Sequence, residues 1–308
     1  MSHNLVKEKE LELRVMESVD CIIYGANLKG CTVALSAAQN GKKVLLIERL
    51  AHPTGTFLFA SVDVLQMPID NNSLLMDVPG IAGRFVKKMI QMEGLKYSIN
   101  SGKMFISVDH EVYKAGMLAL LQEAGVELLL HTTLSEVIEK NGNKYIITEN
   151  KNGRQAYETK SYLCMKTDDV PIPQIGTCIF GIDNVNIDCI KEDVDRCAEN
   201  NGADLFHGCI DYDTGRSIDV ISLHKHQLTY VIAKVNMPDA GKKDPLSRSR
   251  AEMYLQKQSI LILDELKKKN DGFKDAYVTW FLYDSFGEDI HADAIQSMHS
   301  AEQEGLKL

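Results

Sequence analysis

The sequence predicts an α/β protein with a central parallel sheet and an inserted second lobe made mainly of β-strands. Two observations support this fold class. Within residues 19–50, a short apolar strand, an Ala-rich segment with helical spacing and a second apolar strand follow one another. Between residues 171 and 237, short strand-like segments alternate with turn residues. The first pattern is typical of a parallel sheet with crossover helices, and the second of antiparallel strands.

Residues 19–50 combine these regular elements with a glycine-containing turn. The expected elements are a strand at 21–24, a helix at 28–40 and a strand at 44–47. Gly25 allows a tight turn after the first strand, and Gly30 lets the helix and the strand approach closely. Glu48 closes the second strand about twenty residues after the turn, where an acid accepts hydrogen bonds from a ribose. The segment therefore predicts a Rossmann-like, dinucleotide-binding unit.

Asn27 occupies the middle position of the pattern G-x-G-x-x-G, of which Gly25 and Gly30 are the first and third glycines. A glycine there lets a pyrophosphate come against bare backbone at the helix N-terminus, where N–H groups and the helix dipole stabilise the anion. Asn27 adds a side chain that can donate and accept hydrogen bonds. Two outcomes remain open: the side chain is accommodated beside a phosphate, or it fills the phosphate's place.

The rest of the chain alternates between helical and strand-like spacing. The predicted elements are helices over 81–93 and 112–124, strands over 126–130, 136–140, 144–149 and 156–164, a polar helix near 190–199 and a helix over 244–269. Asn141 and Gly142 mark a hairpin turn. Asp244 is expected to cap the last helix, with Pro245 in its first turn.

These elements predict four parts of the chain. The expected parts are a charged, helical N-terminal arm over 1–17, a Rossmann-like nucleotide-binding domain over 18–170, a mainly β substrate or interface lobe over 171–240, and a C-terminal helical segment over 241–308 that returns to the first domain. This division assumes that each lobe is drawn from neighbouring elements.

Composition narrows the class of partner. A net charge of −9 argues against nucleic acid or an anionic membrane as the main partner. No apolar run has the length of a membrane span, and the N-terminus lacks the apolar segment of a signal peptide, so we expect a cytoplasmic protein. The seven cysteines include no C-x-x-C pair, which disfavours a metal or redox site, and Cys21 and Cys31 are expected in the core.

Several segments, in this order, resemble the FAD-dependent oxidoreductases of the glutathione-reductase type. The segments are LLIER at 45–49, the glycine-containing loop at 54–56, LLQEAGVELLLHTTLSEVI at 120–138, ENKNGRQA at 149–156 and DPLSRSRAEMYLQKQ at 244–258. The resemblance covers most of the chain. It implies a two-lobed protein, in which a substrate lobe interrupts an FAD lobe.

The resemblance also implies FAD as the cofactor. In such proteins the chain that returns to the first sheet lays its backbone against the adenine, near the position of Leu134. The residues expected to contact the cofactor are Gly25, Asn27, Gly30, Glu48, Arg49, Thr56, Leu134 and Thr167. A small-molecule substrate is implied, and no metal site is expected.

Departures from the family pattern fall around the same cofactor. Asp168 stands where the family carries a glycine, so it would bring a carboxylate towards a pyrophosphate. Asn27 is the second departure. The third is that the chain ends at Leu308, whereas the family continues into a segment that holds the flavin. From this we expect a flavin site that is completed by another subunit or has been lost.

Three functions therefore remain open. The chain is an oxidoreductase-like subunit of a flavoenzyme complex that transfers hydride between a small molecule and flavin, or a non-catalytic structural or regulatory subunit, or a module for another adenine ligand. The expected assembly is a homo-oligomer or a hetero-oligomer with a flavoprotein subunit.

No catalytic residue is assigned from the sequence. Asp63 and Gln66 lie in the loop where the family's flavin face would be. His131 is expected to be a half-buried strand-end residue. His224 and His226 share a face if they lie on a strand, but no further ligand completes a metal set.

Overall fold

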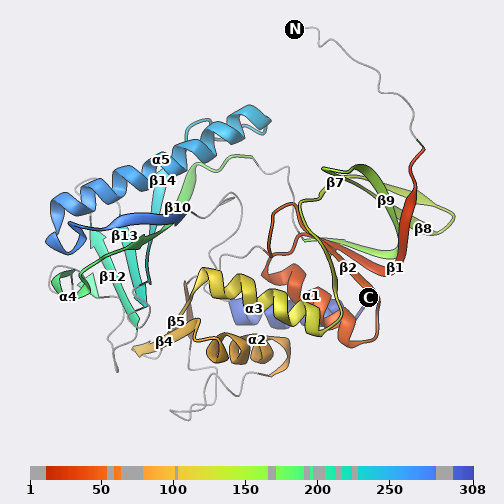
Figure 1. The fold of residues 1–308 in the computed structure, drawn as a ribbon, viewed down its shortest axis with the longest axis horizontal. Coiled ribbons are helices and arrows are strands. Elements are labelled where there is room, and N and C mark those ends of the chain that lie inside the picture. The colour runs from red at the N-terminus through yellow and green to blue at the C-terminus, as the bar shows by residue number, and fades with distance from the viewer. Residues whose placement is uncertain are drawn as a thin grey trace, which may run out of the picture. The chain divides into compact units, whose positions relative to one another are not determined.

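The chain consists of two compact units (Figure 1). The computed structural model describes residues 12–53, 59–63, 79–100, 103–165, 171–190, 195–196, 205–211, 217–223, 228–281 and 294–308. The first unit comprises Met1–Thr54, Met117–Lys166 and Met298–Leu308, and the second comprises Gly55–Gly116 and Thr167–Ser297. This grouping differs from the division expected from the sequence. Residues 55–116 and 241–297 belong to the second unit, and only the end of the last segment joins the first.

A six-stranded sheet forms the centre of the first unit, with the order β6-β2-β1-β9-β8-β7. The strands are β1 (Val15–Tyr24), β2 (Val44–Ile47), β6 (Glu127–Leu129), β7 (Thr133–Lys140), β8 (Asn143–Asn150) and β9 (Gly153–Cys164). The first four in this order run parallel, and β8 and β7 continue the sheet antiparallel. Helix α1 (Leu28–Gln39) links β1 to β2. The predicted strand–helix–strand unit is confirmed, with its first strand inside the sheet.

Burial explains why these segments form the central strands. All four residues of β2 are buried, as is the segment 21–24 of β1. Strands buried on both faces read as continuous apolar runs, which is the pattern the sequence shows. The hairpin turn between β7 and β8 places Asn141 at φ 54° and Gly142 at φ 80°, the left-handed backbone that a two-residue hairpin loop requires.

The N-terminal arm is not helical where the structure describes it. The segment from Val15 to Glu17 belongs to β1 and pairs with β9 at Ala156 and Tyr157. The 12-residue β9 is long enough to pair with this segment as well as with the rest of β1. Pairing with a neighbouring strand thus overrides the local helical spacing. Residues 1–11 lie outside the described part of the chain.

The second unit contains an antiparallel sheet with the order β11-β12-β13-β14-β10-β15. Its strands are β10 (Ile175–Asp183), β11 (Asp195–Arg196), β12 (Leu205–Asp211), β13 (Ser217–Leu223), β14 (Leu228–Asn236) and β15 (Tyr277–Phe281). Helix α5 (Pro245–Lys269) lies along one face of this sheet (Figure 1). Their shared core includes Phe180, Val231 and Leu266, each fully buried. The mainly β character expected of the second lobe is confirmed.

The remaining elements complete the two units. A three-stranded sheet has the order β3-β5-β4, formed by β3 (Phe59–Asp63), β4 (Leu95–Asn100) and β5 (Lys103–Val108). The other helices are α2 (Gly80–Gln91), α3 (His110–Glu123), α4 (Ile187–Ile190), the 3₁₀ helix η3 (Asp271–Phe273) and α6 (Ala294–Gly305). The polar helix expected near 190–199 is wrong where it can be compared. Helix α4 ends at Ile190, and the next described residues form β11, which pairs with β12.

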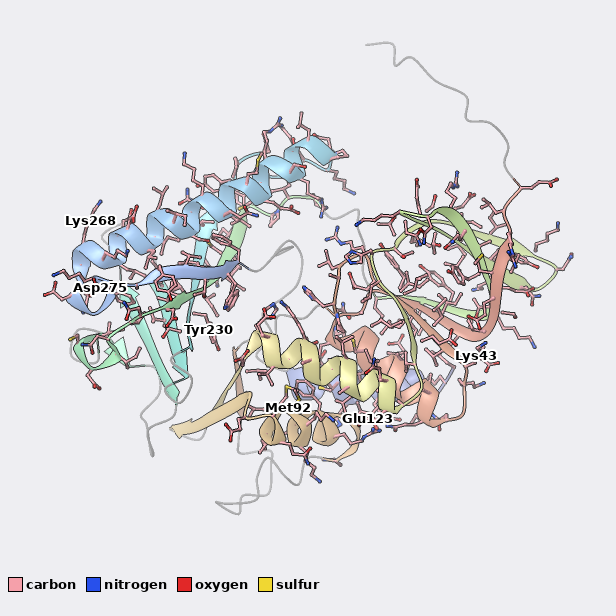
Figure 2. All side chains as sticks on the ribbon, viewed as in Figure 1. Lys43, Met92, Glu123, Tyr230, Lys268 and Asp275 are labelled. Carbon is pink, nitrogen blue, oxygen red and sulfur yellow. The ribbon has the colours of Figure 1, made fainter. Side chains whose placement is uncertain are left out.

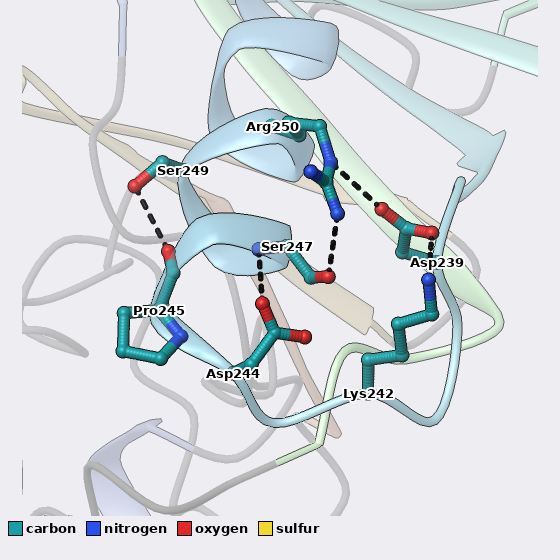
Figure 3. A network of polar contacts seen from close by, with 7 residues as sticks. All are labelled: Asp239, Lys242, Asp244, Pro245, Ser247, Ser249 and Arg250. Atoms are coloured by element: carbon teal, nitrogen blue, oxygen red, sulfur yellow. Dashed lines mark hydrogen bonds and ion pairs between the residues drawn. The ribbon is translucent and has the colours of Figure 1, made fainter. Parts of the chain in front are cut away.

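The N-terminus of α5 is fixed by a network of polar contacts (Figure 3). The carboxylate of Asp244 accepts a hydrogen bond of 2.8 Å from the backbone N–H of Ser247, so Asp244 is the predicted N-cap. Asp239 accepts from Lys242 at 2.6 Å and from Arg250 at 3.1 Å. The hydrogen bond from Ser247 lowers the pKa of Asp244. The negative charge of this cap therefore favours the folded helix.

We predict that Asp244→Ala lowers the midpoint of thermal unfolding at neutral pH, because the N–H of Ser247 loses its acceptor. The folded-state pKa of Asp244 is depressed, so its contribution to stability is present above the unfolded pKa of about 3.9 and is lost as the pH falls through the folded value. The difference between the variant and the unmodified chain should shrink below about pH 4. Calorimetry over a pH series measures it. Glu265→Ala, at an exposed site on the same helix, is the control, and an equal effect of both substitutions would contradict the capping role.

Candidate functional site

The turn between β1 and α1 lies at the carboxyl ends of the parallel strands, the edge where open α/β sheets bind their ligands. Gly25 begins the turn at φ 102°, a conformation that favours glycine. Its N–H donates to the carbonyl of Ile47, the last residue of β2, at 2.8 Å. The turn therefore continues the pairing of the two strands for one residue beyond β1.

Gly30 lies where the helix passes closest to the turn. A Cβ atom at this position would come within 1.9 Å of the Gly25 carbonyl oxygen, a distance that no real contact allows. The close approach expected of the third glycine is therefore present. It brings the first turn of α1 directly against the end of β1.

Asn27 caps α1 with its own side chain. Its backbone is extended, at φ −72° and ψ 178°, so the position makes no demand for glycine. The side-chain oxygen accepts from the N–H of Gly30 at 2.8 Å, and the amide nitrogen donates to the carbonyl of Met165 at 2.9 Å. The amide thus links the helix N-terminus to the residue that follows β9.

This cap uses only part of the anion-binding capacity of the helix. The first N–H groups of an α-helix have no partner within the helix. Asn27 engages the N–H of Gly30, whereas those of Leu28 and Lys29 lie in the first turn, ahead of the first helical bond from Cys31 to Asn27. The exposed side chain of Lys29 adds a positive charge at the same end of the helix. The turn therefore retains donors that fit a pyrophosphate.

Glu48 is fully buried, with 0 % of its surface exposed. One carboxylate oxygen accepts from the N–H of Ala26 at 2.7 Å, and the other accepts from the N–H of Leu50 at 3.1 Å. Its backbone N–H donates to Leu129 at 2.9 Å, and its carbonyl accepts from Thr132 at 3.0 Å. Glu48 therefore joins the β1–α1 turn, the end of β2 and the chain that leaves β6.

These bonds bear on the expected ribose contact of Glu48. A carboxylate without exposed surface can meet a ribose hydroxyl only after neighbouring atoms move aside. Each oxygen keeps a lone pair, because a carboxylate has about four acceptor sites and these two bonds use only two. In this conformation the observed role of Glu48 is to hold the turn, and the ribose contact is a proposal.

The other expected contact residues are placed less closely around the turn. Arg49 follows Glu48 and is half-buried. Leu134, in β7, is half-buried and packs against the core of the first unit, beside an irregularity in the pairing with β8. His131 is exposed, at φ 52°, in contrast to the half-buried position expected.

Several sequence candidates fall outside the described residues. These are Thr54, Gly55, Thr56, Gln66, Thr167, Asp168, His224 and His226. Asp63 is the last residue of β3. Within the described ranges, no three His, Cys, Asp or Glu side chains gather in a way that could hold a metal ion. No helix there is long and apolar enough to cross a membrane.

Two buried cysteines support the strand and helix behind the turn. The thiol of Cys31 donates to the carbonyl of Ala26 at 3.3 Å. Burial raises the pKa of this thiol well above its usual value, and the nearby Glu48 carboxylate adds to the effect. Burial also raises the pKa of Cys21 to about 11. Both residues are small core residues, as expected from the sequence.

The residues that the sequence did not reveal take part through their backbone. Ala26 and Leu50 donate N–H groups to Glu48, and Met165 supplies the carbonyl that binds Asn27. Every residue carries a backbone carbonyl, and every residue except proline carries a backbone N–H. No residue type at these positions therefore signals the contact. The sequence signal came from the glycine pattern, with Asn27 at its middle position, and from the acid Glu48.

The matched family agrees with this geometry. Residues 20–163 match the model of the family described as FAD dependent oxidoreductase. The chain is similar to Protein FixC of Salmonella typhi and of Salmonella typhimurium, at 28% identity over 144 residues in each case. The match covers 40% of this chain and 31% of FixC, so it spans about a third of those relatives.

Solved structures show the same fold over most of the chain. A flavoprotein/dehydrogenase from Cytophaga hutchinsonii has a TM-score of 0.57 at 12% identity, covering 93% of this chain and 77% of that one. A geranylgeranyl bacteriochlorophyll reductase-like protein from Thermoplasma acidophilum has a TM-score of 0.55 at 15% identity, covering 94% and 78%. The myxobacterial chondrochloren halogenase has a TM-score of 0.52 at 13% identity, covering 94% and 73%. The chain therefore shares its α/β fold with these three proteins.

We predict that Glu48→Ala lowers the free energy of unfolding, because the N–H groups of Ala26, which is buried, and of Leu50, which is half-buried, lose their acceptor. Leaving a buried donor unsatisfied costs about 1–3 kcal/mol. Urea denaturation followed by circular dichroism measures the change. Glu149→Ala, at an exposed position on β8, is the matched control and should stay within about 0.5 kcal/mol of the unmodified chain. Equal unfolding midpoints for the two variants would contradict the role assigned to Glu48.

Proposed function

We propose that this chain is an FAD-dependent oxidoreductase-type subunit that binds the pyrophosphate of FAD at the first turn of α1. The observation that carries the proposal is the backbone of the β1–α1 turn. Gly25 and Gly30 meet the two conformational demands of a dinucleotide-binding turn, and the first N–H groups of the helix lie at its end. The family match over residues 20–163 supports FAD as the dinucleotide.

Each proposed contact follows from the position of its residue. The N–H groups of Leu28 and Lys29, with the Lys29 ammonium, stabilise the negative charge of a pyrophosphate. Glu48 orients the turn, and accepts from the ribose if its surroundings open. The remaining proposed contact residues are Arg49, Thr56, Leu134 and Thr167. Bound FAD supplies the capacity to accept a hydride from a small molecule, and the chain contributes binding and orientation.

We further propose that a second subunit contributes to the reaction. The sequence offers no convincing acid–base residue, and Asn27, at a position that faces the cofactor in the family, is engaged by two bonds within the protein. A chain that binds FAD but lacks its own proton donor or acceptor requires these groups from elsewhere. The partner is another flavoprotein subunit or a second copy.

A second candidate function is that of a non-catalytic subunit without FAD. The observation that favours it is that Asn27 and Glu48, the two polar side chains at the turn, both form hydrogen bonds with the protein's own backbone. Asn27 binds Gly30 and Met165, and Glu48 is buried between Ala26 and Leu50. Such a subunit would keep the flavoprotein fold for its interfaces. The two candidates differ in one measurable property, the capacity to bind FAD.

We predict that the purified chain takes up FAD and that Asn27→Gly binds it more tightly, because the N–H of Gly30 becomes available to the pyrophosphate. One added hydrogen bond to a charged group stabilises by about 1.5–3 kcal/mol, which corresponds to roughly a ten-fold to hundred-fold gain in affinity. Quenching of flavin fluorescence during titration measures the dissociation constant.

Asn40→Gly provides the matched control, because it makes the same substitution at the other end of α1, where Asn40 is the C-cap. Its affinity for FAD should equal that of the unmodified chain. If neither the unmodified chain nor Asn27→Gly binds FAD, alone or in the complex isolated from its cells, the first function is rejected in favour of the second.

A further inference from the structure

Three Asn-Gly pairs lie in the described part of the chain, at 40–41, 141–142 and 152–153. Each of the six residues is exposed. An asparagine that precedes a glycine is open to a spontaneous reaction, because glycine has no Cβ to shield its backbone nitrogen. Exposure does not distinguish the three pairs, so backbone conformation and hydrogen bonds determine which of them reacts.

The reaction is deamidation. The backbone nitrogen of the glycine attacks Cγ of the asparagine and forms a new N–C bond, which closes a cyclic succinimide. The amide group leaves as ammonia and takes the proton of the attacking nitrogen with it. Water then opens the ring at either carbonyl and yields aspartate or isoaspartate, with no oxidant or reductant involved. The attack requires the asparagine side chain to lie on the same side of the Cα–C bond as the next nitrogen.

The pair at 40–41 is held at the end of α1. The Asn40 amide donates a hydrogen bond to the carbonyl of Ser36 at 3.0 Å. The N–H of Gly41 donates to the carbonyl of Ala38, also at 3.0 Å. Both groups that must react are therefore engaged by the last turn of the helix.

The pair at 141–142 is locked by its backbone. Asn141 has φ 54°, and in this left-handed conformation Cβ lies beside the residue's own carbonyl oxygen, away from the next nitrogen. The turn must therefore open and change its type before the ring can close. A hydrogen bond of 2.6 Å from the Asn143 amide to the Glu158 carboxylate fastens this end of the hairpin to β9. The bond makes such an opening rarer.

The pair at 152–153 lies in the turn between β8 and β9, two of the green strands in Figure 2. The neighbouring strands stop short of this turn, because β1 pairs with β9 only from Ala156 onwards and β7 begins its pairing with β8 at Glu149. Asn152 is not among the described residues with positive φ, and the positive value falls on Gly153, at 90°. Within the described ranges the Asn152 side chain makes no hydrogen bond.

We propose that Asn152 is the residue of these three pairs that deamidates in the folded chain. The closing pair of its turn joins Asn150 to Gly153, so the opening of this one pair frees the attacking nitrogen. A hairpin end without flanking strands opens at low cost. Asn141 needs an opening of the same kind and a change of turn type as well, and Asn40 must leave the bonds of the helix end. Asn152 therefore has the lowest barrier.

The product changes both charge and backbone. Either form of the product adds a negative charge to a chain whose net charge is −9. The isoaspartyl form also inserts a methylene group into the backbone of the short turn that sets the pairing of β8 with β9. This inference does not depend on flavin, so its failure is separable from failure of the proposed function.

Peptide mass spectrometry of the chain, incubated in mildly alkaline buffer, tests the site. In the folded chain, deamidation at Asn152 should be at least about ten-fold faster than at Asn141, the ratio that corresponds to 1.4 kcal/mol of additional opening cost. The two sites are matched in sequence, because each pair follows a lysine. In urea, where the turns no longer exist, the two rates should converge.

Asn152→Gln should abolish the mass change in its peptide, because glutamine would have to close a larger ring, whereas the matched variant Asn141→Gln should leave that rate unchanged. Circular dichroism establishes that each variant is folded. A folded chain that does not react at Asn152, or that reacts as fast at Asn40 or Asn141, would overturn the proposal. A ratio that persists in urea would also overturn it, because the selectivity would then come from the local sequence and not from the fold.

Discussion

The arrangement of the sheet edge at the β1–α1 turn depends on the bond between the Glu48 carboxylate and the backbone of this turn. The carboxylate is fully buried, and its bonds reach Ala26 on one side and Leu50 on the other. A buried charge is tolerated only where hydrogen bonds satisfy it, and here the donors are the N–H groups of two turns. Because these turns follow β1 and β2, one side chain determines how two neighbouring strands end. The peptide of Glu48 extends the same restraint to the chain around β6.

Asn27 provides a second restraint on the other side of the turn. Its amide bonds Gly30 in the helix and Met165 after β9, so the helix N-terminus is tied to a third strand end. Glu48 and Asn27 together connect the ends of β1, β2 and β9 through protein atoms.

The sequence predicted the regular elements best where burial alone decides them. The strand at 44–47 and the long helix capped by Asp244 were predicted at their observed bounds, because a buried strand and a capped helix leave strong local patterns. The failures involve partners distant in sequence. Val15–Glu17 became strand because β9 offers backbone partners about 140 residues away, and the assignment of 55–116 to the second unit rests on contacts that no local pattern encodes.

In the candidate site, too, the features with a local sequence pattern were predicted and those that depend on distant partners were not. Gly25, Gly30 and Glu48 were singled out because their spacing is typical of a dinucleotide-binding unit. The structure brings them together, because Gly30 lies against Gly25 and Glu48 accepts from the N–H of Ala26 in the β1–α1 turn. The donor to Glu48 was not predictable, because it is a backbone N–H 22 residues earlier in the chain and carries no side-chain signal. The sequence therefore singled out Glu48 correctly as a residue of this site, but it predicted a bond to a ribose and not the observed bonds to Ala26 and Leu50.

Amide hydrogen exchange at Ala26 in the flavin-free protein tests most directly whether Glu48 holds the turn. If the carboxylate bonds this N–H, exchange should be slow in the unmodified chain and about ten-fold or more faster in Glu48→Ala, in line with the loss of 1.4 kcal/mol or more. Exchange in the centre of β8, far along the same sheet, should change less. Equal rates at Ala26 in the two proteins would contradict the account.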